Sequence, residues 1–353
     1  MDVSILISTF NRCPLLAATL DSLAAMHVRD DLAWNVIVVD NNSTDGTRTL
    51  VESRTKTFPV PLRYLFEHRQ GKSHALNAGI AATAARVILY TDDDVLVDPG
   101  WLEAGARPLL ERDDIHYTGG PVLPLWEVPP PAWFKAPSGV LRGPLALLDY
   151  GPETFVFEDR RLIPLGVNLA LSRSVIDRVG GFHTAMDRRG TSLLGQGQAE
   201  FFFRTRAAGL KGLYVPSMRV RHHAPASRIS AGYFRRWWYW KGVARARIED
   251  WHPVSELGLD LAAVPRLLRL PRFMWRSAAG DAAGWLAAVV RGDTIRRIER
   301  EAMLAYFAGY FMGRRRAAGQ AAVHLAKAGR AAAESVVSHD PVGTARPPVR
   351  ELS

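Results

Sequence analysis

Three consecutive aspartates, Asp92, Asp93 and Asp94, end an apolar run in the segment VILYTDDDVLVDPGW, residues 87–101. At an effective dielectric constant of about 20, two ionised carboxylates ~5 Å apart repel each other by roughly 3 kcal/mol. A divalent cation would remove this repulsion. Mg²⁺ or Mn²⁺ beside a diphosphate fits, because these ions prefer oxygen ligands and complete their shells with substrate phosphates. The alternative, a solvated run of surface charges, rarely ends so apolar a strand, so the segment predicts a metal site.

Other chemically active side chains occur at the ends of expected elements. Asp40 ends the apolar run WNVIVVD, where it is either a functional carboxylate or a capping residue of the turn DNNSTDG. Lys72 follows Gly71 in GKSHALNAGI, and at a helix N-terminus its ammonium and the backbone N–H groups would meet a phosphate. His222 ends a further short strand. An isolated histidine is more often structural than a metal ligand, so its role depends on whether its strand returns to the aspartates.

The elements that must hold these groups alternate between short apolar runs and segments of helical period. The pattern predicts strands at 3–8, 34–40, 62–66 and 87–92, with helices at 15–26, 47–53 and 71–85 between them. Such alternation predicts an α/β fold, with a mostly parallel sheet covered by helices on both faces. Ligands of these sheets bind beyond the carboxyl ends of the strands, so Asp40 and the three aspartates are expected at one rim.

The pattern becomes less regular after Gly100. Residues 119–134 are rich in proline and aromatic residues and are expected to form a long surface loop at an acceptor site. Further strands are predicted at 163–172 and within 211–223, and further helices at 173–182 and 199–209. We expect a domain of residues 1–225, an aromatic and basic helical extension of residues 226–330, and a disordered tail of residues 331–353 with too little apolar content to pack.

The charge of the chain predicts an anionic partner. Its 353 residues include 45 lysines and arginines against 35 aspartates and glutamates, and residues 233–300 alone contribute +6 of the net +10. A nucleotide diphosphate, acidic lipid headgroups or nucleic acid would satisfy this excess. The aromatic and basic segments 233–251 and 261–275 are either interfacial membrane helices or an ordinary packed layer with solvated arginines, and both readings stay open.

Several features predict a cytoplasmic protein. Cys13 is the only cysteine, so no intrachain disulfide forms and a reducing compartment fits. The start MDVSILIST has no basic n-region and is interpreted as a core strand, not a signal peptide. The best uncharged candidate for a membrane span, 302–313, falls far short of the ~20 residues that a bilayer requires. We expect the chain at most to lie peripherally on the inner face of a membrane.

Six motifs together give a resemblance to a known family. They are ILISTFNR, VIVVDNNSTDGT, GKSHALNAGI, YTDDDVLVDPGWL, GVNLALSRSVIDRVGGF and YVPSMRVRHH. Their order and spacing over residues 1–245 resemble those of family 2 glycosyltransferases, which have the GT-A fold, a Rossmann-like arrangement. The resemblance implies transfer of a sugar from a nucleotide diphosphate sugar to a hydroxyl acceptor, with inversion and with help from Mn²⁺ or Mg²⁺. The acceptor would be a glycan, a lipid-linked molecule or another alcohol, as in polysaccharide biosynthesis, and nucleic acid would not be a partner.

The resemblance also implies roles for residues at the nucleotide. Thr9, Arg12 and Asn42 would contact the nucleotide sugar, and Lys72 would lie near the nucleotide. Asp40 resembles the carboxylate that hydrogen-bonds the base.

Further roles are implied at the diphosphate. Asp92 would lie nearer the ribose, and Asp93 or Asp94 would bind the metal. His222 falls where some GT-A enzymes have a further metal or diphosphate contact.

The sugar and acceptor side is less regular. Asn168 and the Gly180–Gly181 turn resemble the floor of that site. Family members commonly have Gly-Glu-Asp-x-Glu before the helix that is expected near Phe201, and its Asp is taken to be the catalytic base. Gln198 occupies that Asp position, and a carboxamide cannot accept a proton at neutral pH.

Another group must therefore act as base. Glu200 is the expected base, but it can face the site only if the helix starts after it, because residues 198 and 200 of one helix point in nearly opposite directions. Asp187 is a more distant candidate. A substrate-supplied base, or loss of transfer activity, is the remaining alternative.

Three rival functions bear on this interpretation. A nucleotidyltransferase would carry a Gly-rich basic loop after the first strand, where STFNRCPLL has one arginine and no glycine. A haloacid-dehalogenase-type phosphatase would place its aspartates on the first strand, which here has none of them. A degenerate protein that binds a nucleotide sugar without turnover stays open because of Gln198.

Overall fold

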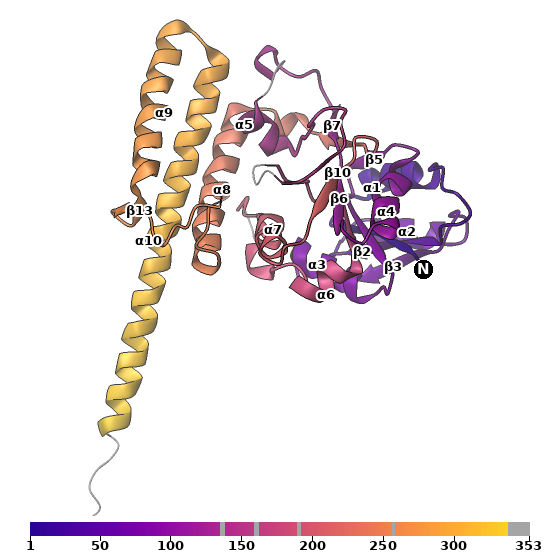
Figure 1. Cartoon of the computed structure of the whole chain (residues 1–353), viewed down its shortest axis with the longest axis horizontal. Coiled ribbons are helices and arrows are strands. Elements are labelled where there is room, and N and C mark those ends of the chain that lie inside the picture. Colours follow the sequence, from indigo (N-terminus) through magenta and orange to yellow (C-terminus); the bar gives the residue numbers. More distant parts are fainter. Residues whose placement is uncertain (135–137, 159–161, 189–191, 256–257, 338–353) are drawn as a thin grey trace, which may run out of the picture.

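The computed structural model describes residues 1–337 except 135–137, 159–161, 189–191 and 256–257, with side chains as far as residue 315. The chain forms a layered α/β body and a set of long helices beside it (Figure 1). Among the described residues, no helix is both long and apolar enough to cross a membrane.

An eight-stranded sheet forms the centre of the body. Its strand order is β3-β2-β1-β4-β9-β6-β10-β8. The strands are β1 (Val3–Thr9), β2 (Trp34–Asp40), β3 (Leu62–Phe66), β4 (Val87–Asp92), β6 (Tyr117–Gly119), β8 (Phe155–Val156), β9 (Asn168–Ser172) and β10 (Gly212–Tyr214). The first four pair in parallel, and β9 runs antiparallel between β4 and β6. The predicted, mostly parallel sheet is confirmed.

Helices cover both faces of this sheet. They include α1 (Cys13–Ala24), α2 (Thr47–Arg54), α3 (Lys72–Ala81), α4 (Trp101–Glu111) and α6 (Arg173–Val179). A Cβ at Gly79 of α3 would lie 3.1 Å from Leu6, and one at Gly105 of α4 would lie 3.5 Å from Leu89. Leu89 pairs with Ile5, the neighbour of Leu6, so α3 and α4 lie on opposite faces. Burial on both sides explains why β1, β2 and β4 are apolar almost throughout.

A second sheet closes the rim where the aspartates lie. It consists of β5 (Val95–Val97), β11 (Val220–Ala224) and β7 (Val122–Trp126). In the pairing of β11 with β5, His222 lies opposite Val95, next to Asp94. The segment 119–134, expected as a loop, contains β7 and the short 3-10 helix η1 (Ala132–Phe134), because its apolar residues pair along β11.

The helix after the altered family motif begins earlier than expected. Helix α7 spans Gly197–Ala207. Both Gln198 and Glu200 therefore lie inside it, on different sides. This placement decides which of them reaches the site.

The C-terminal extension consists of long helices. These are α8 (Ala231–Trp251), α9 (Arg272–Arg291) and α10 (Thr294–Val337), with a β12–β13 hairpin (Arg266–Leu267 and Leu270–Pro271) before α9. Figure 1 shows α9 antiparallel to α10, with α8 between this pair and the body. Helix α10 carries the extension seven residues past the expected boundary at 330, because its end is rich in alanine, the strongest helix former. Residues 338–353 of the expected tail lie outside the described residues.

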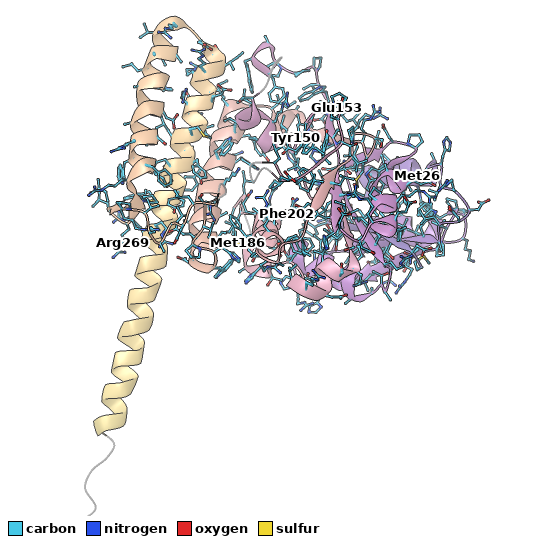
Figure 2. All side chains as sticks on the ribbon, viewed as in Figure 1. Met26, Tyr150, Glu153, Met186, Phe202 and Arg269 are labelled. Carbon is cyan, nitrogen blue, oxygen red and sulfur yellow. The ribbon has the colours of Figure 1, made fainter. Side chains whose placement is uncertain are left out.

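Apolar clusters join α8 to the body. Phe234 packs with Phe134 and Leu141, from the segment after β7. Val243 packs with Met186, which lies at the border between body and helices (Figure 2). One side of α8 is thus part of the core, so the membrane-surface reading of 233–251 is wrong for that side. The division at residue 225 remains a prediction.

Candidate functional site

A cavity of about 850 Å³ opens at the carboxyl ends of β1 and β4. Its lining comes from the ends of these strands, the start of α3, the segment 139–150, the N-terminal half of α7, β11 and α8. Of the sequence-predicted residues, those that line it are Thr9, Arg12, Lys72, Asp92, Asp93, Asp94, Asp187, Gln198 and His222. The expected rim therefore exists.

Cations and a hydroxyl hold the aspartates in place. The Oγ1 atom of Thr9 donates a hydrogen bond of 2.8 Å to Asp93 Oδ2. Arg12 Nη1 lies 2.9 Å from Asp93 Oδ1 and 2.8 Å from Asp94 Oδ2. Lys72 pairs with Asp92. Both oxygens of Asp93 thus accept hydrogen bonds within the site, and its role as a metal ligand remains a prediction.

Asp94 and His222 leave one position that suits a proton or a cation. The Nδ1 atom of His222 donates to the Leu145 carbonyl oxygen at 3.0 Å, which fixes the orientation of the ring. The Nε2 atom then faces Asp94 Oδ1 at 3.3 Å. That oxygen is buried and has no hydrogen-bond donor among the described residues. Two lone pairs in a buried space repel each other unless a proton or a metal ion lies between them.

The donor set of this position suits a divalent metal. Ligand atoms of Asp92, Asp94 and His222 all lie within 4.8 Å of one another. Two carboxylates and an imidazole are ligands that Mn²⁺ accepts readily, and Mg²⁺ uses the carboxylates. The backbone carbonyl on Nδ1 fixes the ring orientation, as the outer partners of metal-binding histidines commonly do.

The aspartates differ in their electrostatics. Burial raises the pKa of Asp93 to about 6, aided by the charges of Asp94 and Asp92 and opposed by Arg12. Burial would also raise the pKa of Asp94, but the neighbouring His222 and Arg12 outweigh it and hold that pKa well below its usual range. Asp94 therefore stays ionised, as a metal ligand must.

A hydrogen-bonded loop positions Lys72, and sequence analysis missed its central residue, Asn41. The Asn41 Nδ2 donates to the carbonyl oxygens of Glu67 at 3.1 Å and Arg69 at 2.7 Å, while its Oδ1 accepts from Gly71 N at 2.7 Å. The turn-rich sequence DNNSTDG was the available signal for such a side-chain bridge.

Asp187 lies beside this loop at the start of α3. It accepts hydrogen bonds from Ser73 N at 3.0 Å and Ser73 Oγ at 2.7 Å. Gly71 has φ 140°, and a Cβ there would lie 2.3 Å from Asp187 Oδ2, so only glycine fits this approach. The carboxylate is thus held at the cavity wall, where it also orders the α3 N-terminus.

Asp40 and Asn42 do not line the cavity. The Asp40 oxygens accept from Tyr64 Oη at 2.7 Å and Ser43 N at 2.8 Å, which is the turn-capping role that sequence analysis left as the alternative. Asn42 is exposed in the following turn, with φ 71°. Neither side chain is presented to a nucleotide in the described cavity.

Asn168 also lies away from the expected floor. It is fully buried, and its Oδ1 accepts from Trp101 Nε1 at 2.8 Å. Its Nδ2 donates to the carbonyls of Pro121 at 3.0 Å and Met218 at 2.6 Å. The amide therefore ties the two sheets together. The Gly180–Gly181 turn lines a separate, shallower pocket.

Glu200 is wrong as the expected base, because it faces that separate pocket. It is buried, and its carboxylate binds Arg204 Nε at 2.8 Å and His252 Nε2 at 3.0 Å. Gln198, on the cavity side of α7, accepts from Gly166 N at 2.6 Å and donates to Pro164 O at 2.8 Å. An ionised carboxylate could not make both bonds, because it has no N–H to donate. The carboxamide of Gln198 therefore holds the 164–166 segment in place.

Several cations and aromatic residues of the cavity were not assigned from sequence. Arg188 and Arg228 line it near the aspartates, and no hydrogen bond or ion pair with a carboxylate is found for either in the described chain. Desolvation by the cavity walls, with the nearby charges of Arg228 and Arg12, lowers the pKa of Arg188, although part of its side chain is exposed to solvent. From α8, Trp237 and Lys241 reach the wall, with the Lys241 ammonium 4.6 Å from the Trp238 ring. The 233–251 segment was noticed for its aromatics, but its face toward the cavity required the fold.

Part of the chain is similar to known proteins. Residues 4–157 match the sequence profile of glycosyl transferase family 2. The succinoglycan biosynthesis protein ExoM of Rhizobium meliloti is 32% identical over 134 residues, which cover 36% of this chain and 42% of that protein. The validoxylamine A glucosyltransferase of Streptomyces hygroscopicus subsp. jinggangensis is 31% identical over 104 residues, covering 29% of this chain and 24% of that protein. The matches thus span less than half the length of these relatives.

The fold likeness extends further along the chain. The mannosyltransferase PcManGT from Pyrobaculum calidifontis, solved in complex with GDP-Man and Mn²⁺, superposes with a TM-score of 0.57 at 18% identity. The superposition covers 88% of this chain and 86% of that one. At this identity the likeness shows a shared fold, which is GT-A.

Proposed function

We propose that the chain is a family 2 glycosyl transferase, as the match of residues 4–157 suggests, and that it transfers a sugar from a nucleotide diphosphate sugar to a hydroxyl acceptor, with inversion. The observation that carries the proposal is the buried Asp94 Oδ1, which faces His222 Nε2 at 3.3 Å without a donor. A divalent cation held by Asp92, Asp94 and His222 would bind a diphosphate and supply Lewis acidity to its departure. PcManGT, with GDP-Man and Mn²⁺, supports the same donor class here.

The protein's own cations would hold the leaving group. Arg188 and Arg228 line the cavity near the aspartates, with no carboxylate partner among the residues that the structure describes, so a diphosphate would neutralise both. Lys72, held by its pair with Asp92, extends this cationic wall. These cations would then stabilise the negative charge that develops on the diphosphate as the glycosidic bond breaks. One displacement at the anomeric carbon gives inversion.

The acceptor would enter on the α8 side of the cavity. Trp237 and Tyr233 present aromatic surface there, on which a sugar ring would stack, and Lys241 and Arg142 add positive charge. A hydroxyl of a glycan or a lipid-linked sugar would reach the anomeric carbon from this side. The similarity to ExoM supports polysaccharide biosynthesis as the setting.

The proton of the attacking hydroxyl needs an acceptor, and we assign it to Asp187. With Glu200 outside the cavity, Asp187 is the remaining carboxylate predicted for this role, and it does line the cavity. Its hydrogen bonds from Ser73 fix its orientation at the start of α3. Asp149, an exposed carboxylate on the acceptor side, is the alternative to be tested beside it.

Incubation of the purified chain with Mn²⁺ and a panel of nucleotide sugars tests the proposal. Release of nucleoside diphosphate, dependent on the metal and lost in Asp94→Asn, is expected. Release of pyrophosphate from nucleoside triphosphates would instead establish a nucleotidyltransferase. Binding of a nucleotide sugar without turnover, for every acceptor tried, would establish the non-catalytic alternative that Gln198 leaves open.

A further inference from the structure

The C-terminal half of α9 carries apolar side chains that the rest of the chain does not cover. One side of the helix packs on α10, where Met274 and Ala288 are buried and the Trp275 ring lies 5.0 Å from Phe307. On the other side, exposed apolar residues gather over the last two turns. They are Leu286 at 58%, Val289 at 44% and Val290 at 79% exposure. Trp285 borders them at 37% exposure, and its Nε1 donates to Glu301 of α10 at 3.2 Å.

Arginines surround this apolar group. Arg291 ends α9, and Arg296 and Arg297 follow in the first turn of α10; all three are exposed. Asp293 lies 3.5 Å from Arg296 and Glu301 lies 3.9 Å from Arg297, so the three arginines outnumber the two carboxylates that they meet. The turn therefore presents aliphatic and indole groups within a positively charged collar, the combination with which a protein inserts into an anionic bilayer interface.

The turn is held against the body. Ile298, one turn into α10, is buried with Leu141 and Leu145 from the segment after η1. Two residues of that segment, Arg142 and Pro144, line the cavity. A surface that accepts the α9–α10 turn would thus lie next to the acceptor side of the site.

We propose that the α9–α10 turn, residues 285–297, docks the protein on a membrane that contains anionic phospholipid. The inference goes beyond sugar transfer and does not depend on it. We choose this occupant on charge complementarity, because the exposed arginines of the turn are attracted to an anionic surface. A second copy of the chain fits less well, because four partly exposed side chains offer a few hundred Å², against ~800 Å² per partner in a stable dimer.

Sedimentation of the full chain with lipid vesicles tests the docking. We expect the protein to pellet with vesicles of phosphatidylcholine and phosphatidylglycerol at low salt, and not with phosphatidylcholine alone. High salt should release most of it. The double variant Leu286→Asp/Val290→Asp should lower the partition coefficient of the protein onto these vesicles by about tenfold or more. It removes the apolar contact and adds charge repulsion. Arg291→Gln/Arg296→Gln should weaken binding to anionic vesicles only.

A matched control distinguishes the two ends of α9. Leu268 is 67% exposed in the β12–β13 turn, at the opposite end of the helix, and has a φ of 49° that aspartate tolerates. Leu268→Asp should bind as the wild type does. The proposal is overturned if the wild type fails to pellet at low salt, if Leu268→Asp and not the α9 variant loses binding, or if sedimentation velocity shows a dimer that the α9 variant dissociates. Thermal melts confirm that each variant is folded.

Discussion

His222 Nε2 and Asp94 Oδ1 lie 3.3 Å apart, where β11 returns to the end of β4. The opposite ring nitrogen of His222 donates to the Leu145 carbonyl, so the ring cannot turn away from Asp94 without breaking that bond. The pair joins β11 to the aspartates at the end of the fourth strand. It places His222 beside the proposed metal position, which the sequence around β11 alone did not reveal.

Substitution of His222 should show whether this side chain binds the metal. His222→Ala is expected to weaken Mn²⁺ binding by roughly 10- to 100-fold, because one ligand of three is lost. Isothermal titration with Mn²⁺ alone measures it without any substrate. His223→Ala is the control, since the neighbouring side chain lies outside the cavity lining. Equal Mn²⁺ affinity in both variants would remove His222 from the metal site.

Arg188 and Arg228 should contribute to binding of the diphosphate. Arg188→Gln and Arg228→Gln are each expected to weaken nucleoside diphosphate binding by about tenfold, as the loss of one charge-assisted contact does. Binding of the parent nucleoside should not change. Arg221→Gln, exposed on the same strand as His222, serves as the charge-matched control. Equal losses for diphosphate and nucleoside would show that the arginines act on the fold instead.

Asp187 should matter for turnover more than for donor binding. Asp187→Asn keeps an oxygen that accepts from Ser73 but cannot take a proton, so kcat should fall by at least about 100-fold. The Kd for the nucleotide sugar should stay close to the wild-type value. Asp149→Asn is the parallel test, and if it alone abolishes turnover the assignment of the base moves to Asp149.

Glu200 should matter for stability and not for transfer. Its pKa, which burial would raise, is held below the usual value by the hydrogen bonds from Arg204 and His252. A pKa that is lower in the folded state than in the unfolded state stabilises the protein at pH values above the pKa of the unfolded state. This contribution disappears as the pH falls through the pKa of the folded state. Glu200→Gln is therefore expected to cost about 1.5–3 kcal/mol of unfolding free energy at neutral pH, with a smaller difference in acid.

Chemical denaturation at several pH values measures this effect. Glu52→Gln, which breaks an exposed pair with Arg48, should cost less than about 1 kcal/mol and provides the control. Turnover of Glu200→Gln at the wild-type rate is expected below the melting temperature. A loss of turnover in the folded variant would return Glu200 to the catalytic site.

Local patterns were sufficient for the first half of the fold. The strand–helix alternation up to Asp92 reflects a parallel sheet buried on both faces, whose strands are nearly continuous apolar runs and therefore visible in the sequence. The aspartates at the end of β4 could be predicted as a site because their mutual repulsion is a property of neighbours in the chain.

The rest depended on contacts between distant segments. That β11 returns beside β5 is a pairing across most of the body, and no periodicity near His222 encodes it. The error at Glu200 came from a helix boundary: α7 begins at Gly197, and a shift of a few residues turned the expected base to the wrong side. Asn168 looks like a polar site residue in the sequence, yet its amide is fully used by three partners in the core.

Helices α8 and α10 are in close contact beside the cavity. A Cβ at Gly242 would lie 2.1 Å from the Tyr306 carbonyl oxygen, and one at Gly309 would lie 1.9 Å from the Tyr239 carbonyl oxygen, so the two helices touch backbone to backbone. The helix that lines the cavity with Trp237 is therefore in direct backbone contact with the helix that begins at the α9–α10 turn. A methyl group at either glycine would push these two helices apart, and so would change the distance between the cavity and any surface that receives the turn.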